Sequence, residues 1–138
     1  MNNNQLAFLL ARITLGINFF LHGLVRIPKL VDFANGVTKG FDNTLLPSIL
    51  VKPMAYSIPI IEIILGILIT LGISSRKTLT ATAIFIIMLI SGSAFKEDWG
   101  AISTQMLYAL FVFFLIKNLS QEVWTIGNKI NQTNKRTP

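Results

Sequence analysis

The chain of 138 residues contains no cysteine. It therefore cannot form disulfides, carry out thiol catalysis, or hold zinc or an iron–sulfur cluster through thiolates. It also has a single histidine, His22, which excludes a haem with two histidine ligands or a multi-histidine metal centre within one copy of the chain. We therefore expect no metal site and no intrinsic cofactor, and any redox chemistry would have to use a centre supplied from elsewhere.

Charged residues are also scarce. They make up 13% of the chain, whereas soluble domains carry roughly 25%. Hydrophobic residues make up 52%, and the mean hydropathy is +0.63. The net charge of +6 is spread over loops and ends, which favours anionic lipid headgroups over nucleic acid as its partner. These values indicate an integral membrane protein in contact with lipid and not with nucleic acid.

Long apolar runs dominate the sequence, and each is close to the roughly 20 residues that an α-helix needs to cross the hydrocarbon core. They lie at about 6–27, 54–73, 78–95 and 103–119. We therefore predict an all-α fold, an integral membrane four-helix transmembrane bundle that forms a single membrane domain over residues 1–138. Residues 120–138 are expected to form a polar, basic tail.

The connection between the first two helices, at about 28–53, is the longest. It contains prolines and glycines that interrupt helices, yet many of its residues are apolar. We therefore expect a long, partly ordered extramembrane loop at the mouth of the bundle. The distribution of Lys and Arg among the short loops slightly favours a multi-pass topology with both termini in the cytoplasm.

Two helical stripes carry the buried charges. In the first run, Arg12, Gly16, Gly23 and Arg26 share one face, and the glycines would let a neighbouring helix pack closely. In the second run, Glu62 shares a face with Gly66, so Gly16, Gly23 and Gly66 are predicted to be packing positions.

An unpaired carboxylate within a membrane costs at least about 2.5 kcal/mol, so Glu62 needs a partner. Two choices remain open: a buried ion pair between Arg12 and Glu62, or a contact between Glu62 and the end of the first helix that carries His22 and Arg26.

Several polar residues are candidates for binding a ligand or handling protons. Their positions would let them face one pocket between the helices, and the titration range of histidine suits proton transfer. They are Asn18, His22, Arg26 and Glu62, with Gln105 and Tyr108 on the far wall. The simpler alternative is that these side chains only join helices through hydrogen bonds. No residue is assigned a catalytic role.

The segments RITLGINFFLHGLVRIPKL and PIIEIILGILITLGISSR resemble the DoxX family of small four-helix bacterial membrane proteins. The resemblance extends over about 6–119 and rests on Arg12, Gly16, His22, Gly23, Arg26, Pro59, Glu62, Gly66, Gly72 and Arg76. It implies a bacterial inner-membrane bundle whose charged residues face inward. In some members it also implies an association with quinone-linked oxidation of sulfur compounds or with redox-stress complexes.

Two functions from different classes are compatible with these features. The first is a subunit of, or partner to, a quinone-linked membrane oxidoreductase, with a bound quinone and a soluble or membrane redox subunit as partner. The second is a non-catalytic scaffold or assembly protein, and a small-molecule transporter is less favoured. The sequence leaves enzymatic activity and homo-oligomer formation open. A cavity lined by His22, Arg26 and Glu62 that opens laterally to lipid would favour the first function, and a sealed ion pair would favour the second.

Overall fold

The structure is a computed structural model that describes residues 1–126, and the regular elements in this part of the chain are all helices. The main elements are α1 (Asn3–Leu24), α2 (Leu30–Lys39), α3 (Ser48–Leu71), α4 (Ser75–Phe95) and α5 (Trp99–Lys117), with short 3-10 helices at Ile27–Lys29 and Leu119–Gln121. Four helical stretches, which contain α1, α3, α4 and α5, are long and apolar enough to cross a membrane. The predicted all-α four-helix membrane bundle is confirmed.

The helices begin a few residues earlier than the predicted apolar runs, and polar side chains cap two of them, α1 and α5. Asn2 and Gln5 form a reciprocal capping box at the start of α1. Asp98 accepts a hydrogen bond from the backbone N–H of Ala101 at the start of α5. At the other end of a span, Gly72 stops α3 in the left-handed conformation that glycine adopts readily.

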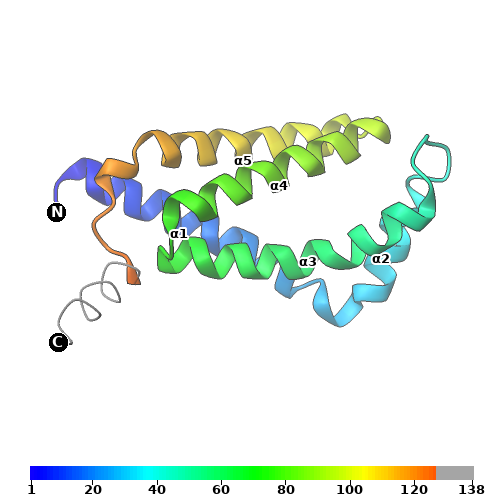
Figure 1. The fold of residues 1–138 in the computed structure, drawn as a ribbon, viewed down its shortest axis with the longest axis horizontal. Coiled ribbons are helices and arrows are strands. Elements are labelled where there is room, and N and C mark those ends of the chain that lie inside the picture. Colours follow the sequence, from blue (N-terminus) through cyan, green and yellow to red (C-terminus); the bar gives the residue numbers. More distant parts are fainter. Residues whose placement is uncertain (127–138) are drawn as a thin grey trace.

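The bundle consists of two helix pairs. In the first pair α1 packs along α3, in the second α4 packs along α5, and contacts between the two pairs are sparse. Figure 1 shows the start of α1 and the end of α5 at one end of the molecule, with α2 at the opposite end. We call these the terminal end and the α2 end. The turn between α3 and α4, which includes Gly72, lies at the terminal end.

The close contact within the first pair depends on glycines. A Cβ atom added to Gly66 would lie 2.7 Å from the carbonyl oxygen of Gly16, and one added to Gly23 would lie 2.7 Å from Cγ1 of Ile63. Both distances are shorter than a van der Waals contact, so the backbones of α1 and α3 approach too closely for a larger residue. In lipid, where apolar surface drives helix association only weakly, such packing is a main source of affinity between helices.

The predicted loop at 28–53 is more ordered than the sequence suggested. It contains α2, which packs on α3, and the first residues of α3, which begins at Ser48 directly after Pro47. Pro53 and Pro59 both lie inside α3, and because proline has no N–H, each leaves the carbonyl four residues earlier without its usual helical donor. Of the predicted tail at 120–138, residues 127–138 lie outside the described part of the chain.

Candidate ligand cavity and buried ion pairs

The buried carboxylate of α3 is paired at the α2 end. Nη1 of Arg26, just beyond the end of α1, donates to Glu62 Oε1 at 2.7 Å and to Oε2 at 2.5 Å. The guanidinium of Arg26 also lies 4.8 Å from the ring centroid of Phe33 in α2, which is a cation–π contact. Arg26 therefore joins α1, α2 and α3, and it gives Glu62 the partner that a membrane carboxylate requires.

Arg12 lies far from Glu62, so the alternative of a buried Arg12–Glu62 ion pair is wrong. Nη1 of Arg12 donates to Glu122 Oε1 at 2.8 Å, and Nη2 donates to the backbone carbonyl of Trp124 at 2.6 Å. Since α1 and α3 run antiparallel, Arg12 lies beside Gly72, ten residues beyond Glu62 and hence about 15 Å further along the helix.

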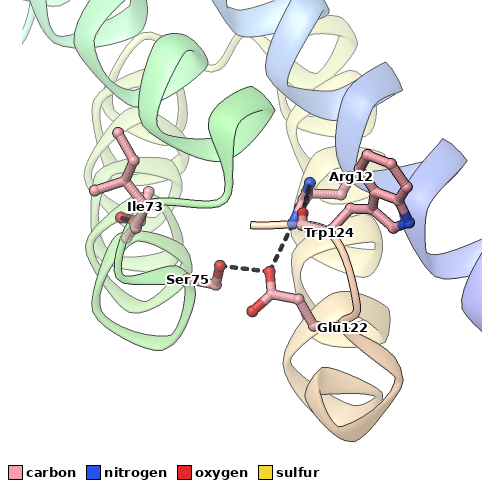
Figure 2. Close-up of polar contacts among 6 residues, drawn as sticks. Arg12, Ile73, Ser75, Glu122 and Trp124 are labelled. Atoms are coloured by element: carbon pink, nitrogen blue, oxygen red, sulfur yellow. Dashed lines mark hydrogen bonds and ion pairs between the residues drawn. The ribbon is translucent and has the colours of Figure 1, made fainter. Parts of the chain in front are cut away.

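Figure 2 shows these contacts at the terminal end, where Ser75 at the start of α4 also donates a hydrogen bond to Glu122. Gly72 leaves the space for this arrangement, because a Cβ atom there would lie 3.0 Å from Cζ of Arg12. The glycine thus both ends α3 and makes room for a buried guanidinium.

Glu122 was not identified from the sequence as the partner of Arg12. It lies 110 positions after Arg12, in a stretch whose polarity predicted a tail, and helical periodicity relates only residues within one helix. A signal was nevertheless present: a buried arginine requires an acid, and Glu122 is the only acidic residue after the last apolar run.

A cavity of about 820 Å³ lies between the two helix pairs at the α2 end. Most of its wall is apolar, and α2 with the residues that follow it contributes Phe33, Val37 and Phe41. Polar side chains line the cavity from several segments: His22, Arg26, Glu62, Ser91, Ser93, Lys96, Thr104, Gln105 and Tyr108. Five of the six predicted ligand residues therefore line one space, and the exception is Asn18.

Asn18 acts through its backbone instead. Its carbonyl oxygen lies 3.0 Å from Nδ1 of His22. Because a carbonyl can only accept, Nδ1 carries the proton, and Nε2 of a neutral ring is then left as an acceptor. The ring of His22 also meets that of Tyr108 edge-on, with centroids 6.1 Å apart.

The far wall is formed by α4 and α5. Nε2 of Gln105 donates to Oγ of Ser93 at 3.0 Å, while Oε1 of Gln105 is buried without a hydrogen-bond partner. Within residues 1–126, no group of three or more His, Asp or Glu side chains could hold a metal ion. The polar groups of the wall are suited to hydrogen bonding with an organic ligand.

Exposed residues of α3 and α4 form one side of the cavity wall. Leu50, Met54 and Phe95 line the cavity, and their exposed fractions are 59%, 43% and 48%. The two helices make few contacts with each other, and Figure 1 shows them diverging toward the α2 end. In a bilayer, an opening on this side of the bundle faces lipid.

These features define a four-span membrane protein with an apolar cavity and an inward-facing ion pair. A family model described as DoxX matches residues 7–97, which are 91 of the 138 residues. The chain therefore belongs to the DoxX family. No curated protein and no solved structure matches it. The matched region contains His22, Arg26 and Glu62 but ends before Gln105 and Glu122.

Proposed function

We propose that this protein binds a quinone from the bilayer and acts as a subunit of, or partner to, a quinone-linked membrane oxidoreductase, in sulfur-compound oxidation or a redox-stress response. The observation that carries the proposal is the cavity, whose wall is mostly apolar, carries His22, Arg26 and Glu62 together, and has exposed residues of α3 and α4 along one side. The family resemblance supplies the ligand class.

The size of the cavity suits such a ligand. Sites for drug-sized molecules measure about 300–1,000 Å³, and the cavity measures about 820 Å³. The flat ring of a quinone would occupy the polar part, beside Phe19 and Tyr108. Its isoprenoid tail would leave beside Met54 and Phe95 and remain in the acyl chains.

Arg26 and His22 could interact with the charge and the protons that a quinone ring gains on reduction. Reduction to the quinol adds two electrons and two protons. In this proposal a partner redox subunit supplies the electrons, and both protons come from water, one after the other. Arg26 would stabilise negative charge that develops on a ring oxygen. His22, whose Nδ1 is fixed by the carbonyl of Asn18, would exchange a proton through Nε2.

The proposed location is the bacterial inner membrane, with both termini in the cytoplasm. In this orientation the terminal end, with Arg76, Lys77 and Lys117, faces the cytoplasm. The cavity then lies in the outer leaflet.

Co-purification tests the proposal. The protein would be purified in nanodiscs, and the bound lipophilic molecules extracted and quantified by mass spectrometry for the wild type, His22→Ala and Glu62→Gln. Thr14→Ala is the matched control, because Thr14 is an exposed residue of α1 that does not line the cavity. We expect quinone with the wild type and the control, and about tenfold less with His22→Ala, which corresponds to about 1.4 kcal/mol. Absence of quinone from all four samples would contradict the proposal.

A non-catalytic assembly protein is the second candidate. It is supported by the ion pairs themselves, since Arg12 and Glu62 each have a partner within the chain and stabilise the bundle without a ligand. In that case the same samples would carry only bulk lipid, and changes at His22 would not alter what is bound.

A further inference from the structure

The two helix pairs are connected differently at the two ends of the molecule. At the terminal end, Arg12 of the first pair donates to Glu122 and to the Trp124 carbonyl, which follow α5 of the second pair. Ser75 of α4 donates to the same carboxylate of Glu122. We call the four residues Arg12, Ser75, Glu122 and Trp124 the Glu122 staple (Figure 2).

At the α2 end, the strong polar contacts stay within one pair. Arg26 and Glu62 both belong to the first pair, while Ser93 and Gln105 belong to the second. In the described part of the chain, the side-chain hydrogen bonds between the pairs lie at the terminal end.

Toward the α2 end the pairs meet through ring contacts. The ring of Phe19 lies 6.4 Å from that of Phe85 and 5.9 Å from that of Tyr108, centroid to centroid. Nζ of Lys96 lies 5.5 Å from the ring centroid of Phe41.

The covalent connections also differ between the two ends of the molecule. The segment with α2 links α1 to α3 at the α2 end, inside the first pair, and the turn at 96–98 links α4 to α5, inside the second. Within residues 1–126, the connection along the chain between the pairs is the turn that contains Gly72 and Ser74, at the terminal end. No covalent link among these residues therefore holds the pairs together beside the cavity.

These two kinds of contact respond differently to a bilayer. When apolar and aromatic faces separate in lipid, acyl chains replace the lost contacts, so separation costs little. When a buried ion pair separates there, the more buried charge, Arg12 in the staple, loses its partner and gains no water. The contact between the pairs is therefore weakest beside the cavity and strongest at the staple.

We propose that the Glu122 staple is a fixed pivot about which the two helix pairs separate at the α2 end, so that a ligand enters the cavity from the bilayer. The motion is a hinge opening of packed elements about a short connection. The proposal requires only that the cavity be filled from lipid, and it does not depend on the ligand being a quinone.

The absence of native cysteine permits a direct test by double electron–electron resonance. Leu10→Cys with Ile116→Cys places two spin labels at the terminal end, and Leu24→Cys with Ser103→Cys places two at the α2 end. All four positions are exposed, and each label pair spans the two helix pairs. In nanodiscs without added ligand, we expect the distance distribution at the α2 end to be about twice as wide as at the terminal end. Equal widths would overturn the proposal.

A second comparison tests the staple itself. In the terminal-end label pair, Glu122→Ala is expected to widen the distribution to that of the α2 end. Gln121→Ala, at the adjacent position that ends the 3-10 helix, should leave the distribution unchanged. An unchanged distribution with Glu122→Ala would show that the staple is not the pivot. The comparison of the two ends in the otherwise native chain remains decisive even where Glu122→Ala fails to fold. Because no ligand is added, a failure of quinone binding would not affect either result.

Discussion

The terminal end and the α2 end each contain an arginine–carboxylate pair. The arginine is the more buried partner at the terminal end, and the carboxylate is the more buried partner at the α2 end. At the terminal end the Arg12 side chain is 4% exposed and that of Glu122 16%. At the α2 end the Arg26 side chain is 26% exposed and that of Glu62 8%. The loss of one partner matters most when the group left behind cannot reach water or headgroups. The two ends should therefore respond in opposite ways to removal of the acid and removal of the base.

The largest effect is expected at the terminal end. Glu122→Ala leaves the Arg12 guanidinium buried without a counter-charge and should lower the free energy of unfolding by about 3–5 kcal/mol. Arg12→Leu should cost less, because Glu122 follows α5 and can turn toward the headgroups. The measurement is unfolding by sodium dodecyl sulfate in mixed micelles. Equal losses for the two variants would remove the proposed difference between the ends.

At the α2 end the order should be reversed. Arg26→Leu strands the buried Glu62 and should cost about 3 kcal/mol, whereas Glu62→Leu leaves an arginine that is partly exposed and should cost less. The double variant Glu62→Leu/Arg26→Leu should be more stable than Arg26→Leu alone, because no charge remains. The same unfolding assay applies. Arg12→Leu combined with Glu62→Leu is the control, and recovery of stability in that variant would contradict the observed pairing.

A third variant tests the close packing of α1 on α3 inside the first pair. Gly66→Ala places a methyl group against the backbone of α1 and should cost about 1–3 kcal/mol, the usual cost of overpacking. Gly36→Ala is the matched control in α2, where a Cβ would meet nothing within 4 Å, and it should stabilise the protein by about 0.5–1 kcal/mol. If both variants were equally stable, the close contact of α1 with α3 would not contribute to stability.

The smallest effect is expected inside the second pair. Gln105→Leu removes a hydrogen bond to Ser93, and such a bond between membrane helices is worth about 0.6 kcal/mol. It also removes the buried Oε1 atom, which lacks a partner, so the thermal midpoint should hardly change. Ser93→Ala should cost more than Gln105→Leu, because it leaves Nε2 of Gln105 without its acceptor. A loss with Gln105→Leu as large as that of Gly66→Ala would show that the polar contact, and not the apolar one, joins α4 to α5.

The sequence was sufficient for the membrane fold and for part of the site. Hydropathy revealed four spans because lipid-facing and buried positions are both apolar in a membrane helix. The stripes on α1 and α3 predicted that Glu62 faces α1. Of the two partners that the sequence left open for Glu62, the structure shows Arg26.

The remaining features depend on contacts between distant segments. Arg12 pairs with Glu122 because the chain turns back after α5. The periodicity of residues within one helix cannot predict such a turn. The order of the 28–53 segment was also underestimated, because its prolines and glycines were interpreted as breaks. The prolines lie outside α2, and the packing of α2 on α3 compensates for Gly36.

In the part of the chain that the structure describes, the turn at Gly72 and Ser74 is the sole stretch of backbone shared by the two halves of the bundle, and both residues adopt positive φ angles there. A gene divided at this turn would encode two helical hairpins, each with its own internal polar contact. Their reassembly from separate polypeptides would then rely on the salt bridge between Arg12 and Glu122 and on a few aromatic rings, which makes the protein a natural candidate for split-fragment complementation.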